Sequence, residues 1–193
     1  MKKEAIESVP VAFEGVIYTV KATPKPLKII QGVSGHFSSG KMTALMGPSG
    51  SGKTTLMDII CGRKNAGTIE GDVRFAGTKA TRSLLKNMCG YVEQFETLIG
   101  ELTVRQMLMY TAELMLPVTW TSRARQERAD EVLATLGLGV CQNTVIGDAL
   151  MRGISGGQAK RVNIALALIH RPAVLFLDEP TCERQQCLGV IAD

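Results

Sequence analysis

The fold is decided by residues 42–62, which read MTALMGPSGSGKTTLMDIICG. This stretch holds a short apolar segment, a glycine-rich turn and an apolar-periodic segment, so it predicts a strand, a loop and a helix. Its loop satisfies the pattern G-x-x-x-x-G-K-[ST] through Gly47, Gly52, Lys53 and Thr54. A loop nearly free of side chains lets several backbone N–H groups approach a triphosphate closely. The stretch therefore predicts a phosphate-binding loop.

The residues at the start of the predicted helix can each contact a different part of a bound nucleotide. A helix that begins near Lys53 directs its unsatisfied N–H groups and the positive end of its dipole toward the phosphates. Lys53 can reach the β and γ phosphates, and the Thr54 hydroxyl can ligate magnesium. The alternative is a structural turn that contains Gly, Lys and Thr by chance. Agreement between strand, turn and helix favours the nucleotide site.

Composition describes an ordinary globular protein. The chain has 193 residues, 45% of them apolar, and a net charge of +4. It has no basic run long enough to suggest a nucleic-acid partner. Five scattered cysteines without a CxxC pair suggest neither disulfides nor zinc, which fits a reducing compartment. We expect no signal peptide, and the most apolar region, 162–177, falls short of a bilayer span, so a membrane role would need a partner.

Strand patterns lie on both sides of the phosphate loop. Residues 9–20, 27–37 and 68–77 are rich in β-branched and aromatic residues, which predicts antiparallel strands. Residues 88–94, MCGYVEQ, predict a short strand that ends in Gln94. A glutamine at a strand end could contact magnesium or an attacking water, although this position alone is a weak signal.

Helices are predicted after this strand. Thr103, with Gln106 three residues on, predicts an N-cap, and residues 121–138 predict a charged amphipathic helix. Residues 153–171, GISGGQAKRVNIALALIHR, open with a capping box formed by Ser155 and Gln158. Free N–H groups, a hydroxyl and a helix dipole converge there, so the segment is either a second anion site or a plain N-cap.

The segment at 173–181, AVLFLDEPT, is a continuous apolar run of the kind found in buried parallel strands. Asp178 and Glu179 end it, at the tip where open parallel sheets bind ligands. Asp178 can hold magnesium through water, and Glu179 can polarise the water that attacks the γ phosphate. The alternative is that two adjacent acids end this strand by chance. The presence of a phosphate loop in the same chain disfavours that alternative.

In this order, GPSGSGKTT, Gln94, ISGGQ and VLFLDEPT resemble the nucleotide-binding domain of an ATP-binding cassette (ABC) transporter. The phrases TALMGPSGSGKTTLMDIICGRKNAGTIEGDV, ELTVRQML and SGGQAKRVNIALALI resemble subfamily G. The resemblance covers residues 9–181. It implies an α/β fold with a P-loop NTPase (RecA-like) core, a flanking antiparallel β subdomain and a helical signature subdomain at about 100–160.

The resemblance also assigns roles. It implies that ATP is bound by the Walker A loop, formed by Gly47, Pro48, Ser49, Gly50, Ser51, Gly52, Lys53, Thr54 and Thr55. It implies signature contacts from Ser155, Gly156, Gly157 and Gln158, and magnesium contacts from Thr54, Gln94 and Asp178. Glu179 would be the general base, assisted by Lys53 and Gln94. Tyr18 would either stack on adenine or be a packed strand residue.

The family further implies partners. Two such domains pair head to tail, so we expect a second nucleotide-binding domain and a transmembrane domain as partners, which places the chain at the cytoplasmic face of a membrane. The implied activity is Mg-ATP hydrolysis that drives export of a substrate, and nothing in the sequence identifies that substrate. The alternatives are a soluble nucleotide-binding ABC module and a non-functional fragment.

Residues 182–193, CERQQCLGVIAD, depart from the family pattern. That pattern would continue with an aspartate-bearing turn and a switch histidine, whereas His36 and His170 both precede the acidic segment. We therefore expect a divergent tail, a sheet that lacks its last strands and impaired hydrolysis, because positioning supplies most of the catalysis in phosphoryl transfer.

Overall fold

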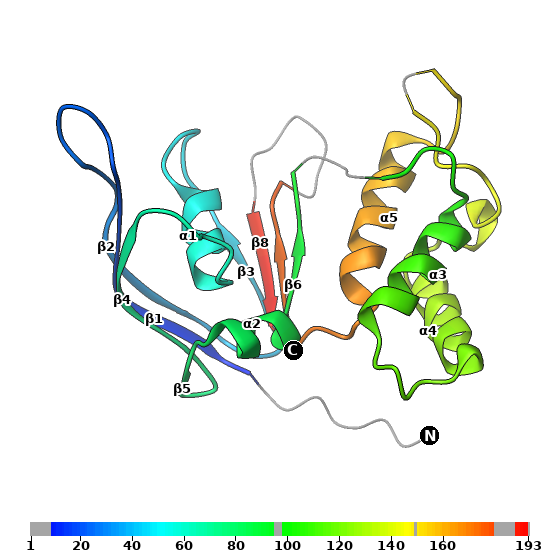
Figure 1. Cartoon of the computed structure of the whole chain (residues 1–193), viewed down its shortest axis with the longest axis horizontal. Coiled ribbons are helices and arrows are strands. Elements are labelled where there is room, and N and C mark those ends of the chain that lie inside the picture. Colours follow the sequence, from blue (N-terminus) through cyan, green and yellow to red (C-terminus); the bar gives the residue numbers. More distant parts are fainter. Residues whose placement is uncertain (1–8, 95–97, 149, 180–187, 193) are drawn as a thin grey trace. The chain divides into compact units, whose positions relative to one another are not determined.

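A computed structural model describes residues 9–94, 98–148, 150–179 and 188–192. The chain divides into two compact units. The first contains residues 9–91, Pro172–Glu179 and the last described strand, and the second contains Val92–Arg171 (Figure 1).

An antiparallel sheet opens the first unit. Its strands are β1 (Val11–Val20), β2 (Leu27–Phe37), β4 (Thr68–Phe75) and β5 (Thr78–Lys79), in the order β2-β1-β4-β5. Val11 and Phe13, and after a register shift Val16 and Tyr18, face the core from β1. The predicted antiparallel strands on both sides of the phosphate loop are therefore confirmed.

The second sheet holds the strands that lead to the site. They are β3 (Lys41–Leu45), β6 (Cys89–Val92), β7 (Val174–Leu177) and β8 (Leu188–Ala192), in the order β3-β8-β7-β6. All four residues of β7 are buried, as its continuous apolar run predicts. The helix α1 (Lys53–Ile60) packs into one core with residues of both sheets, and α2 (Arg82–Met88) contributes Leu85 to it.

The strand β8 was not predicted from the sequence. It lies between β3 and β7, antiparallel to both, with Val190 opposite Thr43 and Phe176. The expectation that the sheet has no strand after the acidic tip therefore does not hold for Leu188–Ala192. The physical reason is that Val190 and Ile191 favour a strand, and an interior strand satisfies the backbone groups of both neighbours.

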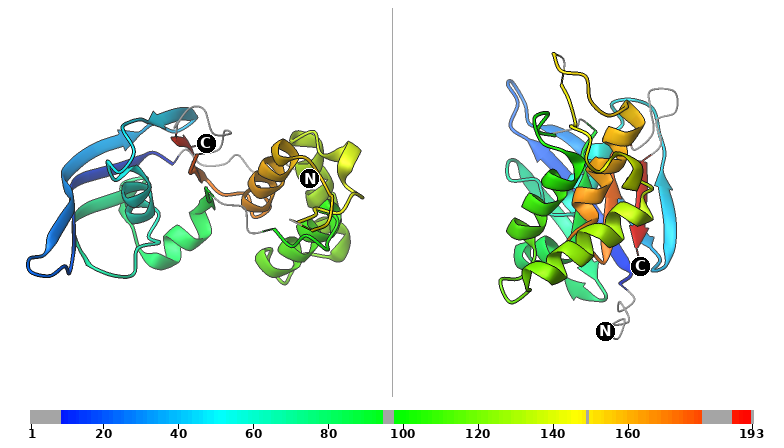
Figure 2. Two further views of the ribbon diagram at one scale, coloured as in Figure 1. Left: turned by 90° about the horizontal axis from the view of Figure 1, so that it is seen from above. Right: turned by 90° about the vertical axis from the view of Figure 1, so that its right-hand side faces the viewer.

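The second unit is helical. Its elements are α3 (Val104–Met115), α4 (Ser122–Thr135), the 3-10 turn η1 (Gly139–Cys141) and α5 (Gly156–Leu168). The three α-helices pack on one another around a core of their own (Figure 2). The N-cap predicted at Thr103 is confirmed, because Thr103 and Gln106 form a reciprocal capping box. The unit extends beyond 100–160 because α5 is part of its core along its length.

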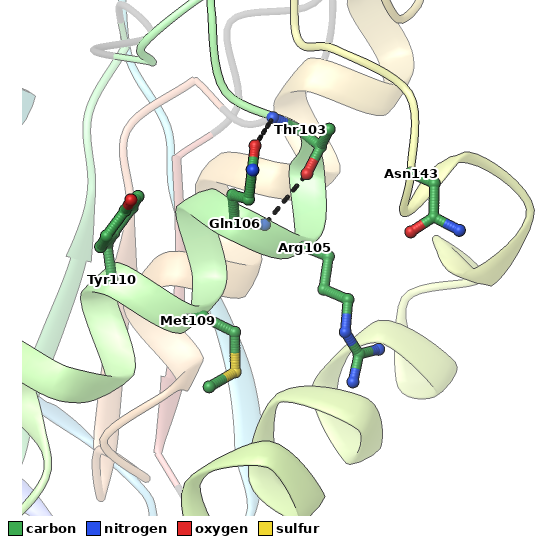
Figure 3. A pocket seen from close by; sticks show the side chains of 6 residues that line it. All are labelled: Thr103, Arg105, Gln106, Met109, Tyr110 and Asn143. Carbon is green, nitrogen blue, oxygen red and sulfur yellow. Dashed lines mark hydrogen bonds between the residues drawn. The ribbon is translucent and has the colours of Figure 1, made fainter. Parts of the chain in front are cut away.

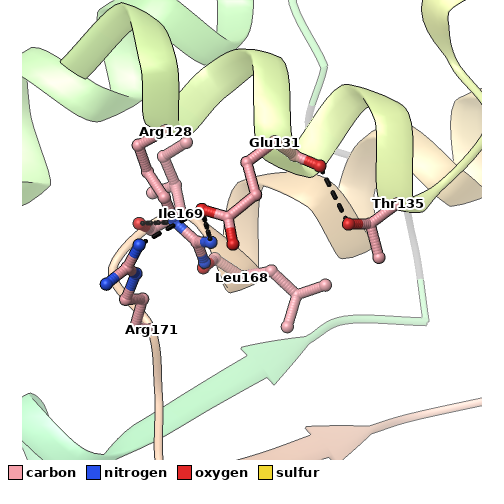
Figure 4. A network of polar contacts seen from close by, with 6 residues as sticks. All are labelled: Arg128, Glu131, Thr135, Leu168, Ile169 and Arg171. Atoms are coloured by element: carbon pink, nitrogen blue, oxygen red, sulfur yellow. Dashed lines mark hydrogen bonds and ion pairs between the residues drawn. The ribbon is translucent and has the colours of Figure 1, made fainter. Parts of the chain in front are cut away.

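Arg128 of α4 forms hydrogen bonds with the C-terminal end of α5 (Figure 4). Its guanidinium donates to the carbonyls of Leu168 and Ile169, and Nη1 lies 2.9 Å from Glu131 Oε2. Arg171 Nη2 reaches the same Glu131 oxygen at 3.2 Å. Burial lowers the pKa of Arg128, and the hydrogen bond from Arg128 lowers the pKa of the Glu131 carboxyl. Arg128 thus satisfies carbonyls that the helix end leaves without an intrahelical partner.

Replacing Arg128 should destabilise the fold much more than replacing an exposed arginine of the same helix. We expect Arg128→Ala to lower the free energy of unfolding by about 2 kcal/mol, the scale of hydrogen bonds to a charged donor. Arg123 pairs with Glu127 across one turn and its side chain is 87% exposed, so Arg123→Ala is the control. That control should cost less than about 0.5 kcal/mol in urea unfolding. Equal losses in the two variants would contradict the role given to Arg128.

The position of β8 in the sheet predicts that the backbone N–H of Val190 contributes to the stability of the fold. Every N–H of an interior strand faces a neighbouring strand, so Val190→Pro should lower the free energy of unfolding by about 3 kcal/mol. Val190→Ala keeps the N–H and should cost clearly less. Urea unfolding followed by circular dichroism measures both. If the two variants are equally stable, β8 does not occupy the centre of the sheet.

Candidate functional site

The loop between β3 and α1 needs glycine at two positions for a physical reason. Gly50 has φ 77° and Gly52 has φ 90°, both in the left-handed region that other residues rarely adopt. A Cβ atom on Gly52 would also lie 2.9 Å from Ile30 Cδ1. The predicted strand, loop and helix are all present, and α1 begins at Lys53 as expected.

Lys53 holds its ammonium group across this loop. Nζ donates to the carbonyl oxygens of Gly47 and Pro48, each at 2.9 Å. An ammonium group has three donors, so these bonds leave one for a ligand. The charge is thereby fixed beside the free N–H groups at the start of α1, which favours an anion there.

A hydrogen bond joins the phosphate loop to the acidic strand. Thr54 Oγ1 donates to Asp178 Oδ1 at 3.2 Å, across 124 positions of the sequence. Tyr91 of β6 donates from its hydroxyl to Asp178 Oδ2 at 3.3 Å. Asp178 is only 4% exposed, and each of its carboxylate oxygens accepts one of these hydrogen bonds, as buried polar atoms generally require. The structure thus brings together Thr54 and Asp178, which the sequence predicts as magnesium contacts.

Charge around Asp178 favours a bound cation. Burial raises the pKa of the Asp178 carboxyl, the hydrogen bonds from Thr54 and Tyr91 offset part of this, and Glu179 and Asp58 add to the rise. A divalent cation beside these acids would stabilise the charged carboxylate. A hydroxyl and a carboxylate oxygen are ligands that Mg²⁺ prefers. In the described ranges no group of three or more His, Cys, Asp or Glu gathers, so phosphate and water would complete the shell.

Glu179 follows directly at the tip of β7. Its φ of 49° lies in the left-handed region, which is uncommon for a residue other than glycine. Such a conformation persists only where the surrounding structure imposes it. The chain therefore turns sharply directly after the buried Asp178.

The structure places two tyrosines whose roles the sequence left open or did not indicate. Tyr18 is 5% exposed, and its hydroxyl donates to the carbonyl of Ala66 at 2.9 Å. A buried ring offers no free face to adenine, so the structure favours the packing alternative for Tyr18. Tyr91, by contrast, contacts Asp178 and was missed. Nothing in the sequence distinguishes it from a packed strand aromatic.

The second unit carries the other predicted site residues. Ser155 is the N-cap of α5 and forms the predicted capping box with Gln158, which is confirmed. Gly156 and Gly157 are exposed at the start of this helix. The backbone carbonyl of Gln94 accepts a hydrogen bond from Lys160 Nζ at 2.6 Å, so Gln94 is held to α5 within the second unit. The predicted site residues therefore fall into two groups. The signature residues and Gln94 lie in the second unit, and the phosphate loop and the acidic tip lie in the first.

The fold and these two groups define a P-loop ATPase of the ATP-binding cassette class. A family profile described as ABC transporter matches residues 30–182. The chain belongs to the ABC transporter family.

Curated relatives and a solved structure agree with this assignment. The chain is 39% identical over 179 residues to ABC transporter G family member 22 of Dictyostelium discoideum, covering 90% of this chain and 29% of that protein. It is 45% identical over 154 residues to ABC transporter G family member 22 of Arabidopsis thaliana, covering 80% of this chain and 20% of that protein. The chain therefore spans less than a third of these relatives.

The solved structure is the dimeric ATP-binding cassette MJ0796 in a post-hydrolysis state bound to ADP and Pi. The TM-score is 0.72 at 28% sequence identity, and the match covers 91% of this chain and 76% of that chain. The α/β P-loop NTPase fold expected from the sequence is confirmed.

Removing the charge of Asp178 should weaken ATP binding without lowering the stability of the unliganded chain. We expect Asp178→Asn to weaken Mg²⁺-dependent ATP binding at least about tenfold, a loss of roughly 1.4 kcal/mol. Without ligand the variant should be no less stable than the parent, because a buried neutral amide costs less to desolvate than a carboxylate. Asp130 pairs with Arg105 in the second unit, so Asp130→Asn is the matched control and should bind normally. Calorimetric titration with and without Mg²⁺ measures both variants.

Proposed function

We propose that this chain is the nucleotide-binding cassette of a subfamily G membrane transporter, which binds Mg-ATP and hydrolyses it to drive export of a substrate. The observation that carries the proposal is the hydrogen bond from Thr54 to Asp178 at 3.2 Å. It holds the phosphate-loop hydroxyl and the acidic strand tip together, as a shared magnesium site requires. The family membership and the subfamily G relatives support the same function.

Each residue of the site has a role in this proposal. The backbone of Gly47 to Thr55 binds the phosphates, and Lys53 neutralises the β and γ groups. Thr54 and Asp178 would hold magnesium, which would neutralise charge on the phosphates. Glu179 orients and deprotonates the attacking water. Catalysis then depends mainly on positioning and electrostatic stabilisation.

The signature is proposed to act on a second nucleotide-binding domain. Ser155, Gly156 and Gly157 lie exposed at the start of α5, where free N–H groups favour an anion. In a head-to-tail pair, this helix start would close over ATP held by the other domain. The dimeric state of the similar solved cassette supports the pairing.

A transmembrane domain is the second proposed partner. α3 exposes Tyr110, Leu114 and Met115, although large apolar side chains are normally buried. Tyr110 also lines a depression of about 490 Å³, together with Thr103, Arg105, Gln106, Met109 and Asn143 (Figure 3). We propose that this surface docks on the transmembrane domain, which would hold the chain at the cytoplasmic face of the membrane. None of the helices in the described ranges is long and apolar enough to cross a bilayer.

The role of Glu179 has its own test. Glu179→Gln should keep ATP binding, so Mg-ATP at a hundred times its dissociation constant should still add about 2.7 kcal/mol to the free energy of unfolding. Phosphate release should fall about a hundredfold relative to the parent, the lower end of what a general base contributes. The exposed Glu101 provides the control Glu101→Gln, which should change neither. Undiminished phosphate release in Glu179→Gln would show that another group is the base.

A further inference from the structure

A basic depression lies at the C-terminal end of α1, within the first unit. Its volume is about 360 Å³, and it is lined by Cys61, Gly62, Arg63, Asn65, Arg82, Leu85 and Lys86. Three of these residues are cations, and none is a carboxylate. The floor is apolar, because Cys61 and Leu85 are both buried. We call this set of residues the α1–α2 depression.

Close packing fixes the shape of the α1–α2 depression. Gly62 has φ 72°, and a Cβ atom there would lie 2.5 Å from Leu85 Cδ1, so the loop after α1 is pressed onto α2. The Thr81 side chain accepts a hydrogen bond from the Leu84 N–H and caps α2. Arg82 and Lys86 are four residues apart on this helix, which places them on one face.

The charges of the depression are only partly compensated. Arg63 lies 4.1 Å from the centroid of the Tyr91 ring, and its Nε lies 3.7 Å from Asp58 Oδ1. Within the part of the chain that the structure describes, Arg82 and Lys86 form no ion pair and no side-chain hydrogen bond. Like charges four residues apart on a helix repel one another. An anion between them would relieve that repulsion.

The helix dipoles favour a positive charge at the positions of Arg63 and Lys86 but not at the position of Arg82. Arg63 follows the C-terminal end of α1, where a positive charge is favourable, and Lys86 is in the last turn of α2. Arg82, however, is the first residue of α2, at the positive end of that helix, with no acidic residue in the first turn. A cation there is unfavourable for the helix alone. It becomes favourable with an anion beside it.

We propose that the α1–α2 depression binds a phosphate-bearing anion. Two guanidinium groups and an ammonium group suit phosphate oxygens, since arginine can bind them through two parallel hydrogen bonds. The depression is of the size that holds one small ligand. It is separate from the phosphate loop, because it lies at the other end of the eight-residue α1, a rise of roughly 12 Å. The phosphate could belong to a soluble compound or to a lipid headgroup.

Site-resolved titration tests this proposal. Pyrophosphate added to the isotope-labelled chain should shift the amide signals of Gly62, Asn65 and Leu85 in a saturable manner. The double variant Arg82→Gln/Lys86→Gln should weaken this binding at least about tenfold. The matched control removes two exposed lysines, Lys21→Gln/Lys25→Gln, and should change it less than about twofold. Signals of Gly50 and Gly52 report the phosphate loop separately, so failure there does not affect the result at the depression.

Vesicles distinguish the two sources of phosphate. Sedimentation uses vesicles of phosphatidylcholine alone and vesicles that also contain phosphatidylinositol 4,5-bisphosphate. Binding to the second kind that requires Arg82 and Lys86 assigns the site to a lipid headgroup. Pyrophosphate binding without vesicle binding assigns it to a soluble phosphate compound.

Two results would overturn the proposal. The first is the absence of saturable shifts at Gly62, Asn65 and Leu85. The second is an equal effect of both double variants, since it would mean that the chain attracts phosphate only through its overall positive charge.

Discussion

The hydrogen bond between Thr54 and Asp178 is the interaction on which the rest of the site depends. It requires that the first turn of α1 and the tip of β7 lie side by side, although 124 positions separate them in sequence. Tyr91 holds the other oxygen of the same carboxylate, so β6 is tied to this point as well. A buried charged group is tolerated only when its oxygens are held, as both oxygens of Asp178 are here.

The helix α1 links this interaction to the fold. It buries Leu56, Met57, Ile59 and Ile60 in a core shared with both sheets, which fixes its axis. Its first turn therefore meets Asp178, and the segment that follows its last turn forms one wall of the basic α1–α2 depression. One packed helix thus positions two anion-attracting regions, one with glycine-rich backbone and one with arginine and lysine side chains.

Sequence reasoning succeeded where a local pattern decides the structure and failed where distant pairing does. The capping boxes at Thr103 and Ser155 need only residues three apart, and both are present as predicted. The strand β8 pairs with β7, which precedes it closely in sequence, and with β3, which lies more than a hundred positions away, so a five-residue apolar segment gave no sign of its place between them. Tyr18 and Tyr91 look alike in sequence, yet one packs against a loop carbonyl and the other contacts Asp178.

By itself the sequence determined the class of the protein, because a phosphate loop, a capped glycine-rich helix and a buried strand ending in two acids are each written in consecutive residues. Only the tertiary structure decided which side chains meet Asp178, that Tyr18 is buried, and that Arg63, Arg82 and Lys86 surround one depression. The physical reason is that these contacts arise from packing between elements far apart in the chain. Local pattern fixes the elements, and the burial of their apolar faces fixes their neighbours.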